Sequence, residues 1–147
     1  MTKSTLLVEL EETSLILNNA TNKSLVLLDE LGRGTATFDG TAIAKSVLQY
    51  LINKIKCATL FVTHFKCLTQ IFSQNQITSA HMGYLKEENN EEDVLFLYKL
   101  NQGSASNSFG TNVAKMAQLP DSIVKYAKDI SDVFDLLFKA TNDNEEI

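Results

Sequence analysis

The amino-acid sequence predicts an α/β fold, because short apolar runs alternate with stretches of helical periodicity. Two runs, Ser24–Leu28 and Ala58–Thr63, consist almost entirely of apolar and β-branched residues, the pattern of strands buried on both faces of a parallel sheet. Each run follows a stretch in which apolar residues recur at three- and four-residue steps. This order favours parallel strands joined by right-handed crossover helices.

The two helical stretches have recognisable boundaries. The first predicted helix spans residues 5–20 and begins after Ser4, whose hydroxyl suits an N-cap. The second opens near Asp39, after the glycine-rich turn Gly32–Thr35, and carries its apolar residues on one stripe as far as Ile55. We expect that stripe to pack on the sheet.

The second half of the chain predicts a hairpin followed by two helices. Strands over 77–86 and 94–100 flank the polar stretch 87–93, which we interpret as a solvated hairpin loop. Beyond it, residues 109–119 and the stretch that starts at Pro120 predict two helices joined by a tight turn. The polar residues 141–147 are expected to fray.

Composition limits the classes of protein to which the chain can belong. Its 147 residues are 44% hydrophobic and carry a net charge of −5, which suits one folded domain and argues against a DNA-binding module that works alone. Cys57 and Cys67 have no partners at metal-ligand spacing, so we expect both to be reduced packing residues. No apolar run approaches the length of about 18 residues that a membrane span needs, and we expect a soluble intracellular protein.

Two acids follow the first apolar run directly. A carboxylate at the C-terminal end of a buried parallel strand faces the crevice where α/β folds bind ligands, so Asp29 is the candidate Mg²⁺ residue. Glu30 is placed to orient or deprotonate a water that attacks a γ-phosphate. The alternative is a strand that merely ends in two solvated acids.

His64 follows the second apolar run in the same way. In a parallel sheet its side chain emerges at the same edge as Asp29 and Glu30, where it could hydrogen-bond a γ-phosphate. A lone histidine at a strand end is more often structural, but the preceding pair of acids favours a functional role.

Residues 2–5 resemble the end of a phosphate-binding loop without completing it. That motif, G-x-x-x-x-G-K-[ST], needs a glycine before the lysine, and Thr2 stands in its place. We therefore expect half of the nucleotide site to be missing from this chain.

The longest motif lies around the two acids. The stretch Ser24–Ala44, with Asp-Glu-Leu-Gly-Arg-Gly-Thr at its centre, resembles the Walker B strand and the motif that follows it in the MutS family of DNA mismatch-repair proteins. Thr59–Phe65 is similar to the histidine switch of that family. Ser4–Leu10, with Thr13 and Asn19–Thr21, is similar to its signature helix. Gly103–Gly110, with Val113, Ala114, Leu119 and Pro120, is similar to its closing helix-turn-helix.

This resemblance implies an ABC-type P-loop NTPase fold, of which the chain would hold part of the sheet, the β-hairpin and the helix-turn-helix. In such ATPases two subunits enclose ATP between the phosphate-binding loop of one and the signature helix of the other. Asp29 and Glu30 would then serve the Mg²⁺ and ATP of their own subunit, and His64 would sense the γ-phosphate. Ser4 would reach the ATP held by the partner, at a helix N-terminus that favours an anion.

Three further residues are candidates for the nucleotide interface between subunits. Arg33, Thr35 and Asp39 lie in or just after the glycine-rich stretch, and a purely turn-forming role for that stretch is an equal alternative. The resemblance divides the chain into residues 1–103 of the ATPase domain, a helix-turn-helix dimerisation element at 104–138 and a polar tail at 139–147.

The resemblance predicts a fragment of an ATP-hydrolysing mismatch-repair protein that is inactive alone. Its implied partners are a second MutS-homologue subunit, in a heterodimer or homodimer, and mismatched double-stranded DNA bound through domains absent from this chain. The stretches 35–44 and 55–61 look most like the eukaryotic mismatch-sensing subunit of the MutS-alpha heterodimer. Localisation would be the nucleus in a eukaryote and the cytoplasm otherwise, with no membrane association.

Two other interpretations compete with this one. The chain could be an interaction module whose helices between Phe109 and Leu137 dock a partner, in which case charge at Phe109 or Val113 should weaken association. Another ABC protein, such as a transporter subunit, would usually carry a Leu-Ser-Gly-Gly-type signature before the Walker B strand. No glycine precedes Gly32 here, which disfavours the last interpretation.

Overall fold

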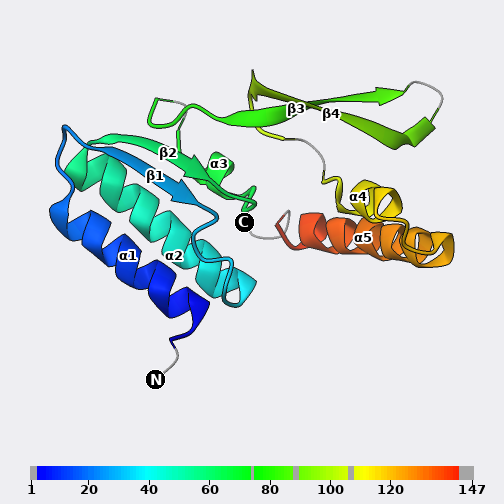
Figure 1. Cartoon of the computed structure of the whole chain (residues 1–147), viewed down its shortest axis with the longest axis horizontal. Helices are drawn as coiled ribbons and strands as arrows, with labels where there is room; N and C mark the ends of the chain where they lie inside the picture. Colours follow the sequence, from blue (N-terminus) through cyan, green and yellow to red (C-terminus); the bar gives the residue numbers. More distant parts are fainter. Residues whose placement is uncertain (1–2, 74, 88–89, 106–107, 143–147) are drawn as a thin grey trace. The chain divides into compact units, whose positions relative to one another are not determined.

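The computed structural model describes residues 3–73, 75–87, 90–105 and 108–142. The chain forms two compact units, 1–79 and 80–147, each of which is described by itself (Figure 1). The first unit contains α1 (Thr5–Asn19), β1 (Leu25–Asp29), α2 (Thr37–Tyr50), the π-helix η1 (Leu51–Ile55), β2 (Ala58–Val62) and α3 (Leu68–Ile71). The second contains β3 (Ala80–Glu87), β4 (Asn90–Gln102), α4 (Gly110–Met116) and α5 (Asp121–Asn142).

The predicted parallel pairing is confirmed. Strands β1 and β2 are parallel neighbours in a two-stranded sheet, in a register that runs from Leu25 opposite Ala58 to Asp29 opposite Val62. Both strands therefore end at the same edge, which fixes where the residues after them emerge. The mixed α/β class predicted from the sequence is likewise observed.

One face of this sheet carries the core of the first unit. Helices α1 and α2 both cover that face (Figure 1), and the alternate side chains of β1 that point toward them are buried, Val26 at 4% and Leu28 at 8% exposed. The other buried members of the cluster are Leu31, Val47 and Leu51, with apolar residues of α1 packed around them. Burial of these side chains is the main force that holds the strands on the helices.

The prediction that these strands are buried on both faces is wrong for the described residues. Leu25 and Leu27 are 65% and 62% exposed, and Leu60 and Val62 of β2 are 62% and 56% exposed. The reason is that both covering helices lie on the same face, so the alternate side chains of each strand point to solvent. The sheet therefore has one buried face and one exposed apolar face.

Helix boundaries in the first unit follow local chemistry. Ser4 is the N-cap of α1, and its side chain accepts a hydrogen bond from the backbone N–H of Leu7, as expected. Helix α2 begins at Thr37, slightly before the predicted start near Asp39, and continues into η1. The π-helix η1 ends at Ile55, and the residue after it, Lys56, is left-handed with φ 59°. A four-residue helix, α3, was not predicted and buries Leu68.

The hairpin of the second unit differs from prediction at both ends. Strand β3 begins at Ala80 rather than at residue 77, and β4 begins at Asn90 within the stretch expected to be a loop. The hydrogen bonds between β3 and β4 join backbone groups and do not require apolar side chains. The polar composition of residues 87–93 therefore does not mark where the two strands stop pairing. Residues 88–89 lie outside the described residues.

Aromatic packing joins the hairpin to the helix that follows. The Phe109 ring lies 4.3 Å from that of Tyr84 on β3 and 6.0 Å from that of Phe96 on β4, both in edge-to-face geometry. Helix α4 ends at Met116, before the predicted Leu119, because Gln118 is left-handed with φ 60° ahead of Pro120. Helix α5 includes Thr141 and Asn142, which were expected to fray; the remainder of the tail lies outside the described residues.

The exposure pattern of β1 makes a direct prediction about stability. Leu28→Ala should lower the free energy of unfolding of the chain by about 2–5 kcal/mol, because it leaves a cavity in the core. Leu27→Ala, one residue earlier on the same strand, is the matched control and should cost under about 1 kcal/mol. Urea unfolding of both variants measures the difference, and equal losses would show that both faces of the strand are buried.

Candidate functional site

The C-terminal edge of the two-stranded sheet carries three predicted residues. Asp29 is the last residue of β1 and is paired with Val62, the last residue of β2. The backbone N–H of Glu30 donates to the carbonyl oxygen of Val62 at 2.9 Å, which extends the pairing by one residue. His64 follows two residues after Val62. The edge thus carries two carboxylates and an imidazole on adjacent chain segments.

Glu30 has an unusual backbone and a charged neighbour. Its φ of 52° is left-handed, a conformation that costs a non-glycine residue on the order of 1 kcal/mol and that clusters at functional sites. Its carboxylate Oε2 forms an ion pair with Nη1 of Arg33, three residues later. The side chain of Glu30 is about one-third exposed (36%), so it remains accessible to a ligand.

His64 lies beside a buried aromatic residue. The His64 side chain is exposed, and its ring lies 4.2 Å from that of Phe65. Phe65 is buried at 6% exposure, and its backbone N–H donates to Oγ1 of Thr63 at 3.0 Å. Sequence reasoning did not single out Phe65, although a large apolar side chain directly after a strand-end histidine is a usable signal.

The loop after Glu30 is fixed by a close backbone approach. Gly32 has φ +89°, and a Cβ atom built on Gly40 would lie only 2.2 Å from the carbonyl oxygen of Gly32 and 3.1 Å from Cζ of Phe65. A Cβ atom on Gly34 would lie 3.2 Å from Cβ of Leu6 in α1. The loop is therefore clamped between the first turns of α1 and α2. The sequence pattern marks Gly40 only as part of a helix start and does not predict this close approach.

Two other predicted residues flank this loop without joining the acids. Thr35 is half-buried in the loop, and Asp39 is exposed in the first turn of α2. Within the described ranges, no hydrogen bond or ion pair connects either of them to Asp29, Glu30 or His64. Their interface roles stay predictions.

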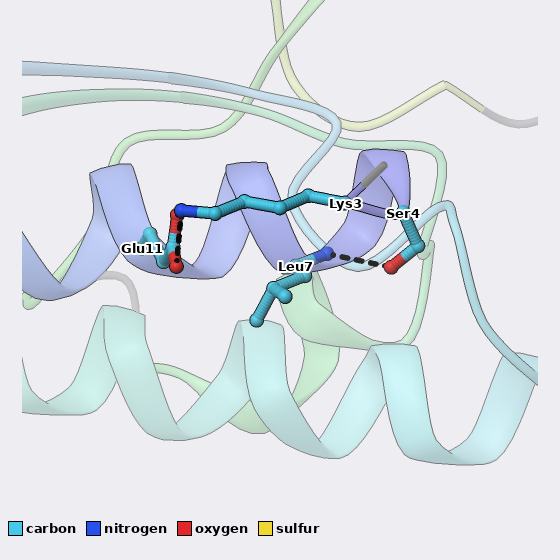
Figure 2. A network of polar contacts seen from close by, with 4 residues as sticks. All are labelled: Lys3, Ser4, Leu7 and Glu11. Atoms are coloured by element: carbon cyan, nitrogen blue, oxygen red, sulfur yellow. Dashed lines mark hydrogen bonds and ion pairs between the residues drawn. The ribbon is translucent and has the colours of Figure 1, made fainter. Parts of the chain in front are cut away.

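Ser4 begins α1 beside the clamped loop. Its Oγ accepts a hydrogen bond from the backbone N–H of Leu7, with an N–O distance of 3.2 Å. The Lys3 ammonium lies 2.6 and 2.8 Å from the two carboxylate oxygens of Glu11. Figure 2 shows both contacts along the first turns of α1. A serine hydroxyl that accepts in this way keeps its own hydrogen for donation. The exposed Ser4 therefore has a donor available for an anion.

The residues at this edge fit Mg²⁺ bound together with phosphates. Among the described residues no group of three or more His, Cys, Asp or Glu side chains is arranged to hold a metal alone. Mg²⁺ commonly uses one or two carboxylates and takes its other ligands from substrate phosphates and water, which is what the exposed Asp29 can offer. A depression of about 650 Å³ between Leu17 and Lys56 lies at the opposite ends of the strands and contains no acid.

Comparisons with known proteins point to one family. The family described as MutS domain V matches residues 1–135. The chain is 54% identical over 134 residues to the probable DNA mismatch repair protein Msh6 of Drosophila melanogaster, covering 87% of the chain and 11% of that protein. It is 50% identical over 131 residues to the DNA mismatch repair protein Msh3 of Dictyostelium discoideum, with coverages of 83% and 9%.

A bacterial relative shows similar identity. The chain is 47% identical over 131 residues to the DNA mismatch repair protein MutS of Thermosipho melanesiensis, covering 89% of the chain and 16% of that protein. The chain thus spans only 9–16% of the length of these three relatives. No helix among the described residues is long and apolar enough to cross a membrane.

The glycine clamp predicts a sharp contrast between two substitutions. Gly40→Ala should lower the free energy of unfolding by about 1–3 kcal/mol, because the new methyl group overlaps the Gly32 backbone. Gly110→Ala is the control, since a Cβ atom there meets nothing within 4 Å among the described residues and alanine favours a helix. Thermal unfolding of both variants tests this; an undisturbed Gly40→Ala variant would contradict the clamp.

Proposed function

Since this chain belongs to the MutS family of DNA mismatch-repair proteins, through its domain V, we propose that it carries part of an ATPase active site. The proposed residues lie at the C-terminal edge of the β1–β2 sheet. The observation that supports the proposal is the shared end of β1 and β2, where Asp29, Glu30 and His64 follow strands paired in register. ATP and Mg²⁺ are the proposed substrate and metal ion.

Asp29 has the proposed role of holding Mg²⁺. It is exposed at the last position of β1, the place where α/β folds bind ligands. A single carboxylate there suits a metal ion that takes its remaining ligands from phosphates and water. The bound ion supplies charge neutralisation on the phosphate oxygens.

Glu30 has the proposed role of orienting the attacking water. It follows Asp29 directly, and the Glu30 N–H bond to Val62 fixes its backbone at the strand end. Phosphoryl transfer depends on placement and electrostatics more than on covalent chemistry, so a fixed carboxylate beside the metal residue is the useful feature. His64, on the adjacent chain segment, has the proposed role of hydrogen-bonding the γ-phosphate.

The phosphate-cradling loop and the rest of the domain would come from other parts of a longer protein. One face of the β1–β2 sheet is apolar and exposed, with Leu27 and Leu60 each 62% exposed. This face supports the proposal, because other segments of a longer protein would pack against it. Ser4 would donate to the ATP of a partner subunit. Mismatched DNA would be bound by further domains, and the similarity to eukaryotic relatives supports a nuclear protein.

Substitution of the proposed water-orienting residue tests this function. In the full-length protein with its partner subunit, Glu30→Gln should preserve ATP binding and slow hydrolysis on the order of 10²- to 10⁴-fold, the usual contribution of acid–base catalysis. Glu12→Gln on α1, also an exposed glutamate, is the control and should leave the rate unchanged. Steady-state hydrolysis with a nucleotide-binding assay gives both values; normal turnover by Glu30→Gln would refute the assignment.

Subunit docking by α4 and α5 is a second candidate function, and it is compatible with the first. The observation that favours it is a set of exposed apolar side chains on these helices and in the turn between them. They are Val113, Met116, Leu119, Ile123, Tyr126, Val133, Phe134 and Leu136. Phe109, by contrast, packs against Tyr84 and Phe96, so charge at that position would disturb the unit itself.

Val113→Asp tests docking cleanly, because Val113 is 49% exposed. It should weaken association with the partner subunit by about 1–3 kcal/mol, an effect in the range of truncated interface residues. Lys128→Glu, on the polar side of α5, is the charge control and should leave association intact. Analytical ultracentrifugation measures both; sedimentation unchanged by Val113→Asp would count against docking through this surface.

A further inference from the structure

Arg33 contacts Glu30 through both its side chain and its backbone. Nη1 of the guanidinium forms an ion pair with Oε2 of Glu30, and the Arg33 backbone N–H donates to the Glu30 carbonyl oxygen at 3.1 Å. No described hydrogen bond or ion pair engages the other carboxylate oxygen, Oε1. The contact therefore restrains the carboxylate and leaves one of its oxygens available.

We infer that Arg33 is a positioning residue for ATP hydrolysis, which holds Glu30 by Oε2 so that Oε1 faces the attacking water. The inference rests on the hydrolytic role proposed above for Glu30 and adds to it the residue that fixes its orientation. Arg33 itself touches neither the water nor the phosphate in this account.

The ion pair matters for orientation rather than for folding. The Arg33 and Glu30 side chains are 72% and 36% exposed, and ion pairs between exposed groups add little to stability. A free glutamate side chain samples several rotamers, whereas a carboxylate held by a planar guanidinium loses that freedom before the reaction begins. A carboxylate that is oriented before the reaction lowers the entropic cost of reaching the transition state, which matters for a reaction such as ATP hydrolysis that depends on geometry.

The backbone around Arg33 is built to fix its position relative to Glu30. Leu31, between them, is buried at 1% exposure in the core cluster. Gly32 adopts φ +89° and lies against Gly40 so closely that neither position has room for a Cβ atom. With Glu30 also left-handed, the three residues that lead to Arg33 are each constrained.

Among the described residues, no cation other than Arg33 forms an ion pair with Glu30. The other described ion pair joins Lys3 to Glu11 along α1 and touches neither acid of the sheet edge. Arg33 is therefore the cation that the fold directs at Glu30.

Steady-state hydrolysis by the full-length protein, assembled with its partner subunit, tests this inference. Arg33→Gln should lower kcat about 3- to 5-fold, because an exposed ion pair restrains its partner only modestly, and leave KM within about twofold of its original value. Arg33→Lys keeps the charge and should recover part of kcat. Lys54→Gln, at the opposite end of the sheet, is the charge-matched control and should behave as the unmodified protein.

The double variant Glu30→Gln/Arg33→Gln separates positioning from an independent effect. If Arg33 acts through Glu30, the double variant should be no slower than Glu30→Gln alone. The inference is overturned by an unchanged or raised kcat in Arg33→Gln, by a rise in KM alone, or by a further loss in the double variant. Should Arg33→Gln fail to fold, the same criteria apply to Arg33→Met, which also removes the charge. Normal hydrolysis by Glu30→Gln would instead overturn the proposed function itself.

Discussion

The parallel pairing of β1 with β2 is the constraint on which the rest of the first unit depends. Because Asp29 lies opposite Val62, the segments after both strands leave the sheet at one edge, and Glu30 and His64 come from these adjacent segments. Core burial of Val26, Leu28 and the leucines behind them holds this register, since a slip by one residue would turn the buried side chains to solvent. Core packing and site geometry thus have one cause.

A second constraint acts on the loop that follows. The near-contact of Gly32 with Gly40, and of Gly34 with Leu6, clamps the loop between two helix starts and leaves Arg33 beside Glu30. The same Gly40 lies against Phe65, whose ring lies beside that of His64. Glycine at these positions lets the loop, the start of α1 and the start of α2 pack with their backbones in contact. The glycines therefore shape the site without taking part in its chemistry.

Much of this arrangement was predictable from sequence, because it depends on local patterns. The two apolar runs gave parallel strands, and Asp29, Glu30 and His64 were placed at their shared edge from spacing alone. One-sided burial of β1 was not predictable, since a short apolar run has the same composition whether one face or both faces of the strand are covered within the chain. The Gly32–Gly40 approach and the Phe65 support were also missed, because contacts between distant residues leave no periodic signal. The roles of the site residues remain predictions.

The most direct test of the central claim is a crystal structure of the full-length protein with its partner, Mn²⁺ and a non-hydrolysable ATP analogue. The account predicts an anomalous Mn²⁺ peak that contacts Asp29, directly or through one water, with Glu30 facing the γ-phosphate from the same edge. Direct ligands would lie at roughly 2 Å, the distance for small hard cations. A metal peak and nucleotide bound away from the ends of β1 and β2 would contradict the account.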